Sequence, residues 1–172
     1  LGGGGLFATV TRAKAILFTI PFAYAHSTAI VSNDSDYHSY ADLDQPGKLV
    51  IGKTGRATLE VARRFFKEAE VKAFVSDTDA ILLAEIANGR ADAYWSTTTK
   101  GDRLLKENPQ FNARLIGDEP EDYVAVAWAI NLGEYHFREL VNIWLTRYIE
   151  EGKTAALWEE WFKTSYVRGD WR

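Results

Sequence analysis

The feature that most constrains the fold is a regular alternation of short apolar stretches and helical stretches through the middle of the chain. Apolar runs that are typical of buried strands occur at 48–52, 71–75, 91–95 and 113–116. Between them, helical patterns cover 58–69, 80–87 and 101–107, with Ser76 and Asp77 as expected caps of the second helix, and Gly89 and Pro109 as helix stops. Strands that alternate with helices predict an α/β fold with a mostly parallel sheet covered on both faces.

The flanking segments are less regular. We expect a short helix at 13–17 that Pro21 ends, a strand at 22–31, a polar loop at 32–46 and a long apolar strand at 123–130. Two helices should close the chain, with Gly152 between them. The second has an aromatic face that is expected to pack in the core, made of Leu157, Trp158, Trp161 and Phe162. The glycine run at 2–5 indicates a processed or truncated N-terminus, with a flexible tag as the alternative.

Composition excludes several function classes. The chain has no cysteine, so it has no disulfide, thiolate metal site or cysteine nucleophile. Its net charge of -4, with acidic and basic residues well mixed, gives no footprint for nucleic acid or an anionic membrane. The apolar stretch at 15–25 is too short to span a bilayer, so direct membrane insertion is not expected. The three histidines, His26, His38 and His136, lack metal-ligand spacing, and we expect neither a metal nor a cofactor.

Four segments, taken in order, resemble the bacterial extracellular solute-binding proteins of family 3. They are TVTRAKAILFTIPF at 9–22, DLDQPGKLVIGKTG at 42–55, LAEIANGRADA at 83–93 and WEEWF at 158–162. Members of this family serve ABC importers, often for amino acids, and have the two-lobed type II periplasmic binding fold. The resemblance implies a small-molecule ligand, importer membrane subunits as partners, and a periplasmic or extracellular location.

The resemblance also implies a domain organisation. Residues 1–30 would be a remnant of lobe one with the first hinge crossing, residues 31–122 would form a complete lobe two, and residues 123–172 would return to a partial lobe one. The family's first strands and helices have no counterpart in this chain. The two crossings, near Ala25 and near Tyr123, would form the hinge.

By the same resemblance, Arg12 would grip the carboxylate of the ligand, because a guanidinium matches a carboxylate with two parallel hydrogen bonds. The second element of the site is the helix start at Gly55, Arg56 and Thr58, where exposed N–H groups attract anions. The family commonly has Gly-Thr-Thr in this stretch, so Arg56 places a charge where a hydroxyl is usual. An ordinary helix start is the alternative interpretation.

The third element departs from the family pattern. Amino-acid-binding members carry an aspartate that pairs with the ligand's ammonium group, and Thr97 occupies its place here. A hydroxyl supplies no charge. A dicarboxylate, a keto acid or another anion is therefore a candidate ligand beside an amino acid, with Lys100 assisting. The alternative is a polar strand-to-helix turn with a capping residue.

Aromatic residues are candidates to line the ligand cleft, although each is also a candidate for the core. They are Phe7, Phe22, Tyr24, Trp95 and Trp128.

Two other functions remain open. The same fold hosts cyclohexadienyl dehydratases, and residues 44–47 (DQPG) resemble a stretch found in them. Those enzymes carry a glutamate near the place of Lys100, where this chain has no Glu between Trp95 and Lys106, although Asp102 is a nearby acid. The third function is a ligand-binding sensor domain of a membrane-bound signalling kinase.

Overall fold

The computed structural model describes residues 2–117, 123–163 and 166 of the chain. The chain divides into two compact units. Unit 1 comprises Leu1–Ala25 and Tyr123–Arg172, and unit 2 comprises His26–Asp122. Within the described residues, no helix is long and apolar enough to cross a membrane.

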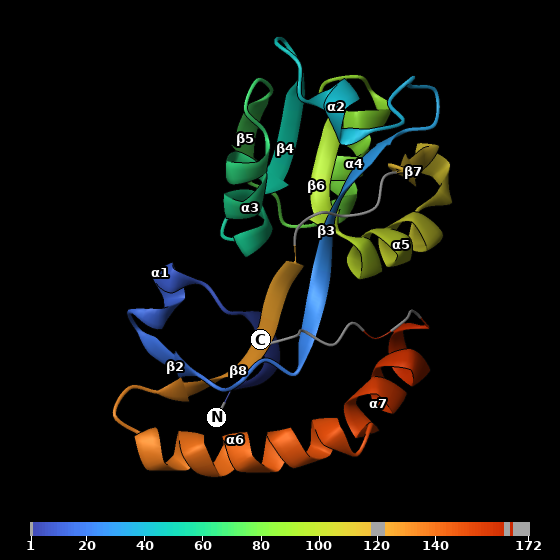
Figure 1. Ribbon diagram of the computed structural model, residues 1–172. Helices are drawn as coiled ribbons and strands as arrows, with labels where there is room; N and C mark the ends of the chain where they lie inside the picture. The colour runs from blue at the N-terminus through green and yellow to red at the C-terminus, as the bar shows by residue number, and fades with distance from the viewer. Residues whose placement is uncertain (1, 118–122, 164–165, 167–172) are drawn as a thin grey trace. The chain divides into compact units, whose positions relative to one another are not determined.

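Unit 2 is built on a mixed sheet (Figure 1). Its centre is three parallel strands in the order β5–β4–β6, with bounds Glu70–Phe74, Leu49–Lys53 and Ala93–Thr97. β3 (Ala23–Ser32), whose first three residues belong to unit 1, pairs antiparallel with β6, and β7 (Ala113–Leu115) pairs antiparallel with β3. The prediction of a mostly parallel sheet is correct for the central strands and wrong for β3 and β7. Alternation predicts parallel pairing only between strands joined by a complete crossover helix, and β3 enters the sheet before the first such crossover.

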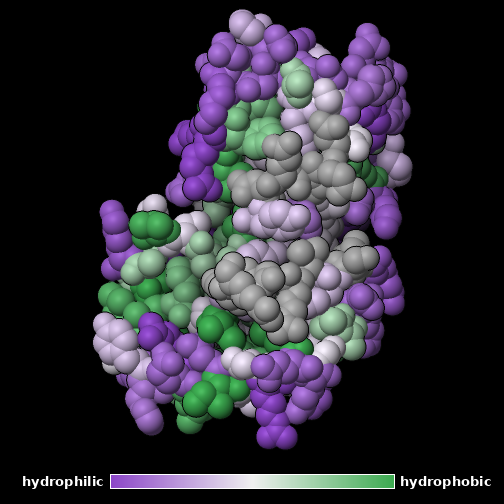
Figure 2. All heavy atoms as spheres, viewed as in Figure 1, coloured by the Kyte–Doolittle hydropathy of each residue, from purple (hydrophilic) through white to green (hydrophobic). Residues whose placement is uncertain are grey.

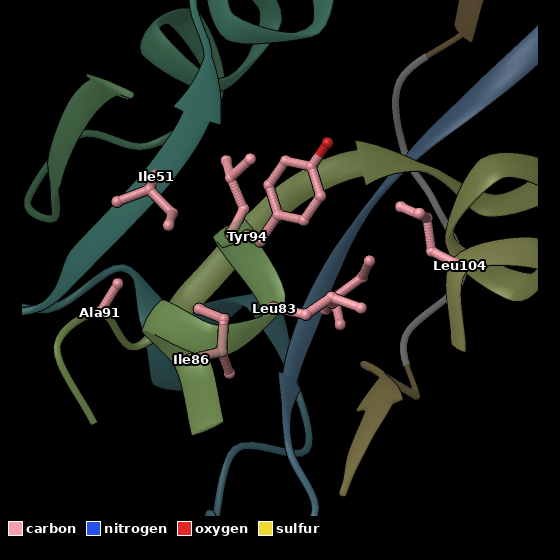
Figure 3. Packing of buried hydrophobic residues seen from close by; sticks show 8 residues of the cluster. Ile51, Leu83, Ile86, Ala91, Tyr94 and Leu104 are labelled. Carbon is pink, nitrogen blue, oxygen red and sulfur yellow. The ribbon is translucent and has the colours of Figure 1, made fainter. Parts of the chain in front are cut away.

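The helices of unit 2 bury their apolar sides against this sheet. They are α2 (Tyr40–Leu43), α3 (Ala57–Phe65), α4 (Asp79–Ala87), α5 (Thr98–Glu107) and the short 3-10 helix η1 (Pro109–Phe111). One core cluster joins α4 and α5 to the strands, and Figure 3 shows it from close by; it contains Ile30, Ile51, Leu82, Leu83, Ile86, Ala91, Tyr94 and Leu104. A second, aromatic cluster surrounds Trp95, which is 1% exposed and contacts the rings of Tyr40, Phe65 and Phe66. Trp95 is therefore a core residue.

Three local predictions in unit 2 are wrong. The helix expected at 58–69 ends at Phe65, because the Asp44 carboxylate accepts the backbone N–H groups of 67, 68 and 69 and turns the chain into β5. The N-cap of α4 is Thr78, and neither Ser76 nor Asp77 caps it. The loop expected at 32–46 contains α2, which a capping box between Ser39 and Asp42 starts.

Unit 1 contains an antiparallel sheet of β1 (Gly2–Phe7), β8 (Tyr123–Asn131) and β2 (Ile16–Phe18). Its helices are α1 (Val10–Ala13), α6 (Tyr135–Glu150) and α7 (Lys153–Phe162). The helix expected at 13–17 is wrong: Thr9 caps an earlier helix, and residues 16–18 pair with β8 instead. The glycine run forms a strand beside β8, which argues against a flexible tag.

The aromatic residues of α6 and α7 lie only partly in the core. Trp144 stacks between Trp128 and Tyr148, and Trp158 packs on Phe162. Trp161, in contrast, is 76% exposed, so the expectation that the whole α7 face packs in the core is wrong. Hydrophobic side chains reach the surface over α1, β2 and α6 (Figure 2). A helical spacing of apolar residues identifies a face, but it does not say how much of that face is covered.

Leu83→Ala should reduce the free energy of unfolding by about 2–5 kcal/mol, because it removes a fully buried side chain and leaves a cavity in the α4 cluster. Ile81→Ala on the same helix is the matched control, since Ile81 is 42% exposed and should change stability by less than about 1 kcal/mol. Urea unfolding followed by tryptophan fluorescence measures both. Equal effects of the two substitutions would contradict this account of the core.

Candidate functional site

The candidate site lies in unit 2, at the edge of the sheet where the three parallel strands end. Each of these strands is followed by a helix: β4 by α3, β5 by α4 and β6 by α5. Parallel strands end at the same edge, so the three helices all begin there. Helix N-termini present unpaired N–H groups and a partial positive charge. The edge is therefore suited to hold a negative charge.

None of these three helices has a side-chain cap. The N-cap residues are Arg56, Thr78 and Thr97, and none accepts a hydrogen bond from the first turn of its helix. Among the other helices, α1 and α2 are capped by Thr9 and Ser39, whereas α6 and α7 also lack a side-chain cap. The N–H groups at the start of α3, α4 and α5 thus remain available to an acceptor other than their own cap.

Charged side chains gather at the same edge. The Lys100 ammonium lies 2.8 Å from the Asp79 carboxylate, and the hydroxyl of Tyr94 donates a second hydrogen bond of 2.8 Å to the same carboxylate. Lys53, at the end of β4, donates to the backbone carbonyl of Asp77 at 3.2 Å. The exposed guanidinium of Arg56 forms no ion pair or side-chain hydrogen bond with any residue in the described part of the chain.

The ionisation of this cluster follows from its burial and its neighbours. Burial lowers the pKa of Lys100, and the positive charges of Arg56 and Lys53 act in the same direction, against the opposing effect of Asp79. Burial alone would raise the pKa of Asp79, but the hydrogen bonds from Lys100 and Tyr94 outweigh it and the pKa is lowered. Burial, together with the Asp79 charge, raises the pKa of Tyr94. The lowered pKa of Asp79 and its 2.8 Å contact with the Lys100 ammonium both indicate an ion pair.

Hydroxyl groups surround the end of β6. Thr97 is 8% exposed and lies opposite Ser27 in the antiparallel ladder, so the two side chains are on the same face of the sheet. The hydroxyls of Ser27 and Thr98 are buried and have no hydrogen-bond partner among the described residues. In the α3 start, Gly55 adopts a left-handed backbone with φ of 79°, and Thr58 is buried.

The remaining predicted site residues lie in unit 1. Arg12 is half-buried on α1, and its guanidinium donates to the backbone carbonyl of Phe7 at 3.1 Å. It forms no other side-chain hydrogen bond and no ion pair with the described residues, so most of its donors are unused. Phe7 and Phe22 pack against a small core cluster of Ala23, Ala25 and Val126.

The structure therefore separates the predicted residues into two groups. Arg56, Lys100, Thr97, Thr58 and Gly55 meet at one edge of unit 2, and the other three belong to unit 1. Sequence reasoning missed three members of the unit 2 group, which are Lys53, Asp79 and Tyr94. Position was an available signal for Lys53, the last residue of β4, and for Asp79, the first residue of α4, whereas Tyr94 is the second residue of β6 and reaches Asp79 only through its hydroxyl.

The chemistry of this group favours ligand binding. It holds ammonium, guanidinium, hydroxyl and helix N–H donors, which together suit an oxygen-rich anion. Within the described residues, no cluster of three or more His, Cys, Asp or Glu could hold a metal ion.

Comparison with known families gives one match over most of the chain. Residues 3–164 match the profile of the bacterial extracellular solute-binding proteins, family 3. Among curated proteins, the chain is 22% identical over 161 residues to the cyclohexadienyl dehydratase of Pseudomonas aeruginosa, which covers 92% of the chain and 59% of that enzyme.

Solved structures of the same fold are also similar. A putative binding component of an ABC transporter from Wolinella succinogenes, complexed with lysine, is 25% identical with a TM-score of 0.75 over 97% of this chain and 70% of that one. An ancestral amino acid-binding protein, described as a precursor of cyclohexadienyl dehydratase, is 24% identical with a TM-score of 0.70 over 92% of this chain and 66% of that one. The chain thus spans between 59% and 70% of the length of these three proteins.

Asp79→Asn should destabilise unit 2 at pH 7 by about 1–3 kcal/mol, because it removes a half-buried, hydrogen-bonded charge. The folded pKa of Asp79 is lowered, so its stabilisation is fully present above its ordinary value of 3.8 and is lost as the pH falls through the lowered value. Denaturant unfolding at pH 7 and near pH 3 should therefore show a difference from the wild type that shrinks with acid. Asp77→Asn, at an exposed position in the same loop, is the control and should have little effect at either pH. A difference for Asp79→Asn that stays constant with pH would contradict the charged pair.

Proposed function

The chain belongs to the bacterial extracellular solute-binding proteins of family 3, and from this premise we propose that it captures a small carboxylate-bearing ligand, an amino acid or a related organic anion, for an ABC importer. The resemblance seen in four segments of the sequence and the predicted α/β fold of the type II periplasmic binding proteins are both confirmed. The ligand, the importer and the site residues are part of the proposal.

One observation supports the proposal most strongly. Three uncapped helix N-termini and three basic side chains share one edge of unit 2, with Asp79 as the acid that is paired there. Such an arrangement attracts a carboxylate through both backbone and side-chain donors. In this proposal Gly55, Arg56, Thr58, Thr97 and Lys100 form the contribution of unit 2 to the ligand site.

Unit 1 carries the remaining residues of the proposal. Arg12 would hold the ligand's carboxylate, because the residue is half-buried and its guanidinium makes one hydrogen bond, to the backbone carbonyl of Phe7, among the described residues. Phe7 and Phe22 would contribute apolar surface beside it. The chain passes between the units near Ala25 and near Tyr123, and we propose that these two crossings form the hinge.

The proposed setting follows from the family. A solute-binding protein delivers its ligand to the membrane subunits of an importer, so we propose those subunits as partners and a periplasmic or extracellular location. We propose no role for nucleic acid or for membrane insertion. The binding role requires no chemical change in the ligand.

A dehydratase is the second candidate function, and the similarity to cyclohexadienyl dehydratase favours it. Loss of a hydroxyl group as water needs an acid that is protonated near the working pH. Asp79 does not meet this requirement, because Lys100 and Tyr94 hold it ionised. Asp102, half-buried on α5, is the acid nearest in sequence to Lys100. In a dehydratase, Asp102 would have to be the acid that protonates the leaving hydroxyl.

Arg12→Ala should weaken ligand binding at least tenfold, because the remaining donors do not replace a paired guanidinium–carboxylate contact. Thermal-shift screening of the wild type against amino acids and organic acids identifies the ligand, and calorimetry then compares the variants. Arg12→Lys should also weaken binding, since lysine keeps the positive charge but cannot make two parallel hydrogen bonds to one carboxylate. Lys14→Ala, an exposed position one residue beyond α1, is the control and should bind normally. Unchanged affinity in Arg12→Ala would remove this residue from the site.

Incubation with prephenate separates the two candidate functions. A binding protein should return the compound unchanged, and the absorbance of an aromatic product should not rise above the spontaneous rate. Turnover by the wild type that Asp102→Asn abolishes would instead establish the enzyme.

A further inference from the structure

From the charges at the edge of unit 2, we infer that the ligand is a dicarboxylate without an ammonium group, and that one of its two carboxylates binds beside Arg56, Lys100 and Lys53. This inference rests on the proposed function and names the ligand class for the same site. It concerns residues of unit 2 alone.

The local charge balance is the first argument. The charges that act on Lys100 are one negative group, Asp79, and two positive groups, Arg56 and Lys53. Lys100 itself is positive and only 22% exposed along its side chain. Lys100 is partly desolvated and is paired with Asp79, whereas Arg56 is exposed, so the one acid is matched to only one of the three bases. A second anion at this edge would offset that imbalance.

The availability of donors is the second argument. Arg56 lies at the N-cap of α3 with no partner for its guanidinium among the described residues. It stands beside the uncapped first turn of the same helix, so a carboxylate there would meet backbone N–H groups and a guanidinium together. A helix start without an adjacent arginine would offer the carboxylate only the backbone N–H groups.

The lack of a suitable acid for an ammonium group is the third argument. Thr97, at the end of β6, offers a hydroxyl, and the nearby Thr98 and Ser27 also offer hydroxyls. Asp79 already accepts hydrogen bonds from Lys100 and Tyr94, so an ammonium ligand would have to displace Lys100 to reach it. Asp77 is exposed to water, where an ion pair contributes little. The described residues of this edge thus favour a negative group over a positive one.

Calorimetry with five probes tests the inference on the full chain. Succinate and glutarate carry two carboxylates and no ammonium group, and butyrate carries one carboxylate. Glutamate has two carboxylates and one ammonium group, and lysine has one carboxylate and two ammonium groups. We expect succinate or glutarate to bind at least tenfold more tightly than each of butyrate, glutamate and lysine.

A matched pair of variants assigns the effect to the edge. Arg56→Gln should weaken the tighter dicarboxylate at least tenfold and leave butyrate nearly unchanged. Arg63→Gln, at an exposed position on the same helix, should leave both unchanged. The Arg56 side chain is exposed and forms no ion pair or hydrogen bond among the described residues, so Arg56→Gln should fold normally, and its thermal unfolding checks this.

The possible failures are distinguishable. Tighter binding of lysine or glutamate than of both dicarboxylates would overturn the inference and leave the proposed function intact. Equal loss of affinity in Arg56→Gln and Arg63→Gln would also overturn it. If these five probes and a full set of amino acids all fail to bind, the proposed function fails, and the inference fails with it.

Discussion

The parallel direction of β5, β4 and β6 is the constraint on which the rest of unit 2 depends. Because these strands run the same way, each needs a helix to return the chain, and each helix must start where a strand ends. Three loops and three helix N-termini are thereby brought to one edge without any sequence signal that is specific to a ligand. The side chains at these loops then decide what the edge binds.

Tyr94 connects this edge to the hydrophobic core. Its ring belongs to the cluster between α4, α5 and the strands, and its hydroxyl oxygen lies at the end of the ring away from Ile86 and Ala91 (Figure 3). That hydroxyl holds Asp79, which in turn holds Lys100. A residue that is 2% exposed therefore fixes the position of two charged groups. Packing of the core and geometry of the charged cluster are consequences of the same side chain.

The sequence predicted the central architecture and only part of the site. Alternating apolar and helical stretches identified β4, β5, β6 and their helices to within a few residues, because burial imposes a strong pattern on long elements. It failed where a single long-range contact decides the structure, as when Asp44 ends α3 through backbone N–H groups more than 20 residues away. The contact between Asp79 and Lys100 was not predicted for the same reason. It depends on how the helices that follow β5 and β6 are placed relative to each other. The exposure of Trp161 was also not predictable, because amphipathic spacing carries no information about what covers a face.

Several departures from local rules lie at the candidate site. Uncapped helix starts typically cost about 0.5–2 kcal/mol each, and a buried hydroxyl without a partner costs a further ~1–3 kcal/mol. At the edge of unit 2, helices α3, α4 and α5 lack side-chain caps, the hydroxyls of Ser27 and Thr98 have no partner among the described residues, and Lys100 is partly desolvated near other bases. Such features also occur elsewhere among the described residues, since α6 and α7 lack side-chain caps and the Thr154 hydroxyl has no partner, whereas α1 and α2 are capped. Selection for stability alone would remove such defects one at a time. What sets the edge of unit 2 apart is that uncapped helix starts lie beside three basic side chains, Lys53, Arg56 and Lys100, so an anion there would meet helix N–H groups and positive charge together.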